Sequence, residues 1–393
     1  MKNGWIKTHL SDVAAVQSGA GFPERYQGQA EREIPFYKVS DMNIAGNERE
    51  MISENNSITE KVRRELGAFL FPRGSTIFPK IGGAIATNKK RLTTRDCCVD
   101  NNVMGVIPKP GKIESDFLFY FFLGHDLSEF ANEAHLPSIK KTVVEGWPIV
   151  LPAALTEQQR IVGILDEAFA GLATAKANAE KNLQNAHALF ESYVESVFIQ
   201  RGKGWVEKTL GEIGKVCMCK RIFKEETIDT AGIPFYKIGT FGKEPDAFIP
   251  NQTYQEYRAK YPFPKKGDVL ISASGTIGRR VRYDGEPAYF QDSNIVWIDN
   301  EEEQVVNDYL YHFYGACAWN STKGATISRL YNDNLRRIVI AFPESLQEQR
   351  RIVAQLDALS EETQRLAMLY KRKLAALEAL KKSLLHQAFS GEL

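Results

Sequence analysis

Two long segments of the chain repeat apolar residues at alternating steps of three and four positions, the spacing of one face of a coiled-coil helix. They cover roughly 156–200 and 347–390, and neither contains proline. A helix of about 44 residues extends about 66 Å and needs an apolar partner along its length. We therefore predict that the two segments pair. The predicted seam is Ile161, Leu165, Ala168, Leu172, Ala175, Ala179, Leu183, Ala186, Phe190, Tyr193 and Val197 against Ile352, Leu356, Leu359, Thr363, Leu366, Tyr370, Leu374, Leu377, Leu380, Leu384 and Ala388.

The two helical segments share an irregularity in their spacing. Each takes two consecutive four-residue steps at the equivalent place, 175–179–183 and 366–370–374. A shared stutter indicates that the helices are matched to each other. The first segment leads from one globular region to the next, and the second leaves that next region. The predicted pairing is therefore antiparallel, with a globular region at each end and a pseudo-two-fold axis across the helices.

Each helical segment follows a region rich in glycine, proline and aromatic residues. The short runs STIF, VMGVI, DVLIS and NIVWI in these regions are typical of strands. We predict a mixed α/β fold with two globular domains, 1–152 and 201–343, joined by spacer helices within 153–200 and 344–393.

The whole chain is an internal repeat. TEQQRIVGILDE at 156–167 returns as QEQRRIVAQLDA at 347–358, with seven of the twelve positions identical, and IPFYK is unchanged at 34–38 and 233–237. Further pairs in the same order are Gly4-Trp5 with Gly204-Trp205, Phe71-Pro72 with Phe263-Pro264, and Asp100 and Asn102 with Asp292 and Asn294.

The two halves differ most in one connecting region. Residues 39–70 of the first half correspond to the shorter 238–262 of the second. Loops absorb insertions and carry function, whereas frameworks do not. We therefore predict a shared scaffold whose functional differences lie in the connecting segments.

Composition is that of an ordinary globular protein. The chain has 393 residues, 43% of them hydrophobic and 25% charged, with a net charge of +1. This balance provides no overall basic field, so a nucleic-acid partner would have to contact local basic faces. Five cysteines form no framework and suggest reduced thiols in a cytoplasmic protein. The longest apolar run, FLFYFFL at 117–123, is too short to span a bilayer.

The sequence contains no familiar catalytic motif. It lacks a phosphate-binding GxxxxGK[ST] loop, GxGxxG after a strand, HExxH, GxSxG and an Asn/Asp-Pro-Pro-aromatic tetrapeptide. The six histidines are scattered, and Cys217-Met-Cys219 is too closely spaced for a structural zinc site without further ligands. We expect no catalytic residues and no metal.

Basic residues cluster beside glycine-containing loops in both globular regions, as in SASGTIGRR at 272–280 and KGATISRL at 323–330. Glycine turns let the backbone approach phosphate, and Lys or Arg beside them adds charge. Hydroxyl, amide and guanidinium side chains are the types that contact base edges. One basic pair alone is more typical of a solvated surface. The predicted DNA-binding residues are Lys80, Lys89, Lys90, Arg91, Lys140, Arg221, Ser274, Thr276, Arg279, Arg280, Thr326 and Arg329.

The order of motifs resembles the specificity subunit of type I restriction–modification systems. The order is GW-x₄-L, IPFYK, a basic glycine loop, a proline-ended strand and EQ-x-RIV-x₂-LD opening a long helix. It occurs twice and ends in LLHQAFSGEL at 384–393. The resemblance covers essentially the full chain.

That resemblance implies a non-catalytic subunit with two target-recognition domains, each reading half of a bipartite, asymmetric DNA target. Two methyltransferase subunits would dock on the helices and bring S-adenosylmethionine, and restriction subunits would add ATP- and Mg-dependent translocation and cleavage. This chain itself would bind no cofactor and no membrane. Spacing and partner docking would fall to helical residues that include Leu165, Leu172, Leu183, Leu366, Leu377 and Leu384.

Three other interpretations compete with this one. A self-sufficient modification enzyme would need a cofactor loop and a catalytic tetrapeptide, and the sequence has neither. A two-headed protein-interaction scaffold without a DNA role is compatible with the near-neutral charge. An orphan specificity subunit would keep the repeat but lack active partners.

Overall fold

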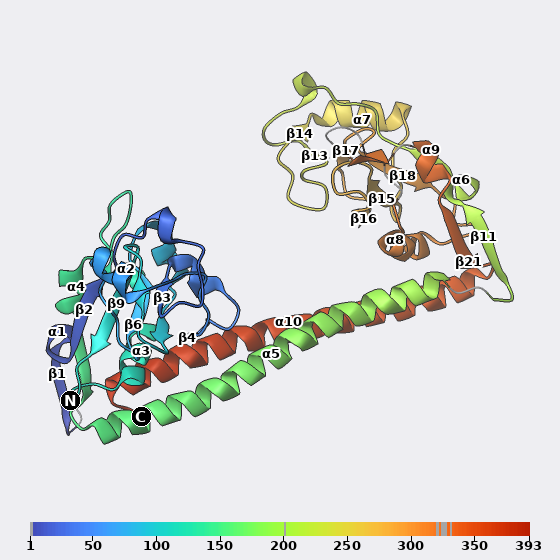
Figure 1. Cartoon of the computed structure of the whole chain (residues 1–393). Helices are drawn as coiled ribbons and strands as arrows, with labels where there is room; N and C mark the ends of the chain where they lie inside the picture. Colours follow the sequence, from blue (N-terminus) through green and yellow to red (C-terminus); the bar gives the residue numbers. More distant parts are fainter. Residues whose placement is uncertain (1–2, 200–201, 320–321, 324–327, 331) are drawn as a thin grey trace. The chain divides into compact units, whose positions relative to one another are not determined.

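The computed structural model forms two compact units, each with a globular head and half of each long helix (Figure 1). Unit 1 comprises Met1–Ala179 and Arg372–Leu393, and unit 2 comprises Glu180–Lys371. We call the globular parts that precede the two long helices head 1 and head 2. The structure describes residues 3–199, 202–319, 322–323, 328–330 and 332–393.

Head 1 is built around a five-stranded sheet with the order β2-β9-β6-β7-β4. Neighbouring strands are antiparallel except β4 and β7, which pair in parallel at one edge. All four residues of β6 are buried, which is why its sequence is an unbroken apolar run rather than an alternating one. The strands are β2 (Ala14–Ser18), β4 (Glu50–Met51), β6 (Thr76–Pro79), β7 (Arg91–Thr93) and β9 (Val103–Pro108).

Head 2 has the same sheet without the added edge strand. Its order is β12-β18-β15-β16, all antiparallel. The four runs that predicted strands lie on β6, β9, β15 and β18, which confirms them. The strands of this sheet are β12 (Lys215–Cys217), β15 (Val269–Ser272), β16 (Arg280–Arg282) and β18 (Ile295–Asp299).

The repeated IPFYK segment forms the central strand of a small second sheet in each head. In head 1, β3 (Ile34–Tyr37) pairs in parallel with β8 (Cys98–Val99) and antiparallel with β5 (Ser57–Ile58). In head 2, β13 (Ile233–Tyr236) pairs in the same way with β17 (Tyr289–Phe290) and β14 (Phe248–Ile249). The identical sequence therefore occupies the identical place.

A two-stranded sheet brings the start and the end of each head together just before the long helix. These pairs are β1 (Trp5–His9) with β10 (Pro148–Pro152), and β11 (Trp205–Thr209) with β21 (Val339–Pro343). The FLFYFFL run lies in a helix, α3 (Ser115–Leu123), buried in the core of head 1. Its equivalent in head 2 is α8 (Asn307–Ala316). The other helices and strands are α1 (Leu10–Val13), α2 (Glu60–Glu65), α4 (Lys141–Glu145), α6 (Leu210–Ile213), α7 (Asn251–Lys260), β19 (Thr322–Lys323), β20 (Ser328–Arg329) and α9 (Asn332–Arg336), with short 3-10 turns between them.

The long helices are α5 (Leu155–Ile199) and α10 (Leu346–Ser390). In unit 1 the Lys176 Nζ lies 2.9 Å from Glu378 Oε1, and Lys381 Nζ lies 5.4 Å from the centre of the Phe169 ring. Residue numbers on α10 thus fall as those on α5 rise, and the predicted antiparallel pairing is confirmed within this unit. In unit 2 the two helices share one apolar cluster with head 2, through Phe190, Val194, Val197, Ile352, Val353 and Leu356.

The seam follows the predicted positions with two exceptions. Tyr193 and Leu380 are exposed, at 36% and 47%, while the neighbouring Val194 is buried and Lys381 is half-buried. The buried face turns here because each helix end also packs on a head. Leu165 is fully buried in the core of head 1, and Leu172, Leu183, Leu366, Leu377 and Leu384 are half-buried.

None of the described helices has an apolar stretch that could cross a membrane. The thiols of Cys97, Cys98, Cys217 and Cys219 are buried, and that of Cys317 is half-buried. Burial raises the pKa of the Cys98 and Cys219 thiols to about 12, so both are unreactive.

Candidate nucleic-acid interface

The repeated Asp-x-Asn turn holds the glycine-containing loop of each head in place. In head 1 the Lys80 N–H donates to the Asn102 carbonyl at 2.8 Å, and in head 2 the Ala273 N–H donates to the Asn294 carbonyl at 2.7 Å. We call residues 80–90 glycine loop 1 and residues 273–279 glycine loop 2. The two loops follow β6 and β15 and are equivalent.

A second segment lies along each glycine loop. The Ile139 N–H donates to the Lys80 carbonyl at 2.9 Å, and the Leu330 N–H donates to the Ala273 carbonyl at 2.8 Å. The same main-chain contact therefore recurs in both heads. In head 1 this second segment also carries Lys140, which is exposed at the start of α4.

Three of the predicted cations of head 1 lie on or near this surface. Lys80 is half-buried, and its Nζ donates to Ser18 Oγ at 3.1 Å. Lys89 is half-buried, and its Nζ contacts the Asn43 side-chain oxygen. With exposed Lys140, they place positive charge on both segments of one surface, as phosphate binding requires.

The two cations that follow Lys89 point into the domain instead, which corrects the prediction for them. Lys90 is 2% exposed and donates to Asn88 Oδ1 at 2.6 Å and to the His125 carbonyl at 2.7 Å. Burial lowers the pKa of its ammonium group to about 8. Arg91 is 8% exposed and donates to the Met42 carbonyl at 2.8 Å. Both side chains therefore hydrogen-bond to main-chain carbonyls inside head 1 and do not face solvent.

Ser272 shapes glycine loop 2 from its base. Its hydroxyl donates to the Thr276 carbonyl at 2.5 Å and accepts from the Arg279 N–H at 2.9 Å. Gly278 has φ +84°, and a Cβ there would lie 2.1 Å from the Trp319 ring nitrogen, so only glycine fits. The result is a tight turn with Thr276 at its exposed tip.

The other predicted residues of glycine loop 2 hold the loop rather than extend from it. Ser274 is buried and donates to Asn294 Oδ1 at 2.8 Å. Arg279 is half-buried and donates to the Phe241 carbonyl at 3.0 Å. Arg280, the first residue of β16 after this loop, is half-buried, with its guanidinium 4.5 Å from the centre of the Tyr311 ring.

The remaining predicted residues of head 2 differ in how far the structure describes them. The Arg221 side chain is 60% exposed and pairs with Asp292 at 2.9 Å, so it braces the Asp-x-Asn turn from outside. Thr326 lies outside the described residues. Arg329 belongs to β20, but its side chain is not among those described.

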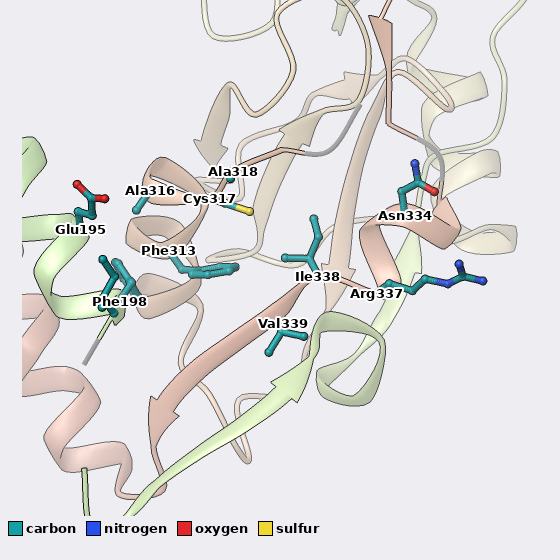
Figure 2. A pocket seen from close by; sticks show the side chains of 11 residues that line it. Glu195, Phe198, Phe313, Ala316, Cys317, Ala318, Asn334, Arg337, Ile338 and Val339 are labelled. Atoms are coloured by element: carbon teal, nitrogen blue, oxygen red, sulfur yellow. The ribbon is translucent and has the colours of Figure 1, made fainter. Parts of the chain in front are cut away.

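A pocket of about 690 Å³ lies in unit 2. Figure 2 shows Phe198, Phe313 and Ile338 around it, with Glu195 and Arg337 at its margins. Its lining is mainly apolar and has no set of groups suited to acid–base or nucleophilic chemistry. No group of three or more His, Cys, Asp or Glu among the described residues could hold a metal ion.

One residue that the sequence analysis did not single out connects head 1 to α5. Gln158 is fully buried, and its amide nitrogen donates to the Pro152 carbonyl at 2.8 Å and the Lys112 carbonyl at 3.3 Å. Its side-chain oxygen accepts from the Glu114 N–H at 2.9 Å.

Gln349 makes the equivalent contacts between head 2 and α10. It is also fully buried, donating to the Pro343 carbonyl at 2.7 Å and the Gln304 carbonyl at 2.8 Å, and accepting from the Val306 N–H at 2.9 Å. The signal that could have identified both glutamines is the repeated EQ-x-RIV motif.

The sequence and the fold are similar to those of known proteins. Residues 2–183 and 202–374 match the model of the type I restriction modification DNA specificity domain. A putative type I restriction enzyme specificity subunit of Haemophilus influenzae is 45% identical over 263 residues, 65% of this chain and 67% of the relative. A type I restriction enzyme specificity subunit of Methanocaldococcus jannaschii is 24% identical over 373 residues, 86% of this chain and 83% of the relative.

Two solved structures share the fold at 18% identity. A chain from a type I restriction–modification system, solved to explain its assembly and conformational transition, has a TM-score of 0.79 and matches over 100% of this chain and 99% of its own. The HsdS subunit of Thermoanaerobacter tengcongensis has a TM-score of 0.64, over 100% of this chain and 98% of its own.

Proposed function

Because this chain belongs to the type I restriction–modification DNA specificity family, we propose that it reads a bipartite, asymmetric DNA target, with one half-site bound by each head. It is the specificity subunit of its system. The observation that carries the proposal is the pair of equivalent glycine loops, each held by an Asp-x-Asn turn and each carrying different side chains at its surface.

The two heads share one backbone framework but display different side chains on their glycine loops, which supports two different half-sites. Glycine loop 1 and its neighbouring segment carry Lys80, Lys89 and Lys140, whereas glycine loop 2 carries Thr276 at its tip. Cations contact phosphate and fix the position on DNA, while hydroxyl groups contact base edges. Two heads with different side chains on one framework should therefore bind different sequences.

Two heads also solve a problem of discrimination. Each well-read base pair contributes about 1–3 kcal/mol, so a head reading three pairs discriminates by roughly 3–9 kcal/mol. A three-pair site recurs about every 64 base pairs by chance, which is too often for one head to select a target. Joining two heads through helices adds a second sequence and a fixed gap.

The chemistry would belong to the partner subunits. Two methyltransferase subunits would dock on the paired α5 and α10 and bring S-adenosylmethionine, and restriction subunits would bring ATP- and Mg-dependent cleavage. The exposed apolar residues Leu189, Met368 and Leu369 on these helices support such docking. The chain would act without catalysis of its own, in the cytoplasm where the chromosome is.

The test is single-molecule methylation sequencing of the source genome with the gene intact and deleted. We expect deletion to remove one gapped, asymmetric adenine-methylation motif. An unchanged methylome would contradict the proposal and favour an orphan subunit or a protein-interaction scaffold. Salt-dependent binding of the assembled complex to the identified target would distinguish a DNA-reading subunit from a scaffold.

A further inference from the structure

An arginine of head 1 joins the head to α5 through two aspartates. Arg49 Nη2 lies 2.6 Å from Asp116 Oδ1 on α3, and its Nη1 lies 3.1 Å from Asp166 Oδ1 on α5. The Tyr120 hydroxyl donates to the same Asp166 oxygen, and the Arg49 guanidinium lies 5.4 Å from the centre of the Tyr120 ring. Strand, head helix and spacer helix therefore meet at one cation.

Head 2 has the same junction with α10. Arg282 Nε lies 2.6 Å from Asp308 Oδ1 on α8, and its Nη2 lies 3.6 Å from Asp357 Oδ1 on α10. His312 Nε2 lies 2.8 Å from that Asp357 oxygen, in the place that Tyr120 takes in head 1. The guanidinium lies 3.7 Å from the centre of the Tyr311 ring.

The two arginines reach this place from different parts of the fold. Arg282 lies on β16 opposite Val269, and the equivalent position on β7, opposite Thr76, is the apolar Leu92. This equivalence follows from the Asp-x-Asn turns that begin β9 and β18. Head 1 therefore lacks an arginine at the position that supplies it in head 2.

The extra edge strand of head 1 supplies the missing cation. Arg49 immediately precedes β4, which pairs in parallel with β7, and the Arg49 carbonyl accepts from the Leu92 N–H at 2.8 Å. Arg49 therefore lies beside Leu92, the position that is equivalent to Arg282 of head 2. It comes from the region 39–70, where the two halves differ most in length.

We propose that Asp166 and Asp357 are receptor carboxylates for an arginine of the head, and that each junction fixes the angle between a head and its spacer helix. Arg49 and Arg282 are then positioning residues for the gap between half-sites. The inference rests on the proposed function, because a gap has meaning only for a bipartite target.

We infer that these ion pairs orient the head on its helix rather than add to the free energy of unfolding. The six charged side chains Arg49, Asp116, Asp166, Arg282, Asp308 and Asp357 are 36–57% exposed, and ion pairs this accessible contribute about 0–1 kcal/mol. A planar guanidinium between carboxylates from different elements nevertheless restricts direction, through a hydrogen bond to Asp116 for Arg49 and through ion pairs alone for Arg282. Two heads that place an arginine between equivalent aspartates from different parts of the fold indicate that this arrangement itself matters.

The first test measures the angle of head 1 without DNA. Spin labels at Lys61→Cys on α2 and Ala177→Cys on α5 of the full chain, in a Cys317→Ala background, report the head-to-helix distance by pulsed electron paramagnetic resonance. We expect Arg49→Gln and Asp166→Asn each to widen the distance distribution at least twofold. The distance distribution of the double variant should be no wider than that of either single variant, because both changes remove the same ion pair between Arg49 and Asp166.

A matched control is Arg25→Gln, which removes an arginine–carboxylate pair with Glu65 inside head 1 and leaves α5 untouched. It should leave the distribution unchanged. An unchanged distribution in Arg49→Gln and Asp166→Asn, or additive widening in the double variant, would overturn the junction.

The second test measures gap selection by the assembled complex. We expect Arg49→Gln and Arg282→Gln to lower the methylation ratio between the natural gap and gaps one base pair longer or shorter at least tenfold, with both half-site sequences unchanged. An unaltered ratio despite a widened distribution would overturn the positioning role. A widened distribution in a protein whose wild-type form specifies no gapped motif would refute the proposed function and leave the junction standing.

Discussion

Gln158 and Gln349 form the same hydrogen-bond pattern in two heads of different sequence, each joining two carbonyls and one N–H of its head to a spacer helix. Both side chains are fully buried, so each is a fixed attachment between head and helix. The junction at Asp166 and Asp357 lies further along the same two helices. Every head is therefore held at a minimum of two places.

Replacing either glutamine by alanine should take away the glutamine partner of three main-chain groups, some buried and some part-buried. Unpaired buried polar groups are costly, so we expect a loss of about 3 kcal/mol in the free energy of unfolding of the affected unit. Urea denaturation followed by hydrogen exchange would measure the loss and locate it. Gln159→Ala is the control, since Gln159 is exposed and its amide donates to the Glu114 side chain at 2.9 Å. Equal losses in Gln158→Ala and Gln159→Ala would contradict this account.

Lys90 should make stability depend on pH in alkaline solution. Burial lowers the pKa of its ammonium group to about 8 in the folded protein, below its ordinary value of 10.5. The unfolded chain therefore binds more protons between these values, and the free energy of unfolding should rise with pH by roughly 3 kcal/mol across them. Lys90→Met should abolish this rise, and Lys89→Met should not. Parallel pH profiles for wild type and Lys90→Met would show that Lys90 is not the source.

His312 should make unit 2 sensitive to acid. Burial lowers the pKa of its imidazole, while Asp357 opposes that shift, and Arg282 and Arg280 reinforce it. Because the folded state disfavours the proton, stability should fall as pH drops below 6.5, the ordinary value. His312→Gln should flatten the profile of unit 2 between pH 7.5 and 5.5, as measured by hydrogen exchange. A wild-type profile that stays flat there would exclude His312 as an acid-sensitive group.

Cations of head 1 that face solvent should contribute to DNA affinity through salt-dependent contacts. We expect Lys140→Ala to weaken binding of the assembled complex and to lower the slope of log affinity against log salt by about 0.9, the release expected for one phosphate contact. Lys90→Met should leave the slope unchanged, because the Lys90 ammonium group is buried. A slope that changed with Lys90→Met but not with Lys140→Ala would place the DNA elsewhere.

Thr276 and Ser274 offer a matched pair within glycine loop 2. Thr276→Ala removes an exposed hydroxyl at the tip and should alter base preference in one half-site only, as read by methylation sequencing. Ser274→Ala removes a buried hydrogen bond to Asn294 and should lower stability by about 1 kcal/mol without changing base preference. A change in base preference with Ser274→Ala but not with Thr276→Ala would show that the tip of glycine loop 2 does not contact the bases.

The sequence was most informative where one pattern was repeated over a long stretch. The proline-free helices and their antiparallel pairing followed from periodicity and chain order, and the four apolar runs from strand patterning. The exceptions at Tyr193 and Leu380 arise because helix ends pack on the heads, which periodicity does not describe.

Side-chain direction within the loops could not be predicted from residue type. Lys89, Lys90 and Arg91 are chemically alike, yet only Lys89 remains on the surface, because the head supplies buried acceptors for the other two, the His125 carbonyl for Lys90 and the Met42 carbonyl for Arg91. The contact of Arg49 with Asp116 and Asp166 could not be predicted from the sequence either. It depends on a two-residue edge strand, β4, which pairs with β7 some forty residues further along the chain.

The partners of Gln158 and Gln349 are main-chain atoms of the heads, so the attachment ignores which side chains a head displays. A head of foreign sequence with the same backbone turn would keep these hydrogen bonds, and would also need an arginine for the aspartate of the helix and apolar side chains that pack on it. Recombination between genes at the repeated glutamine motif would then exchange whole heads and leave the paired apolar positions of α5 and α10 unchanged. In this way a family could acquire new DNA targets by shuffling rather than by point mutation.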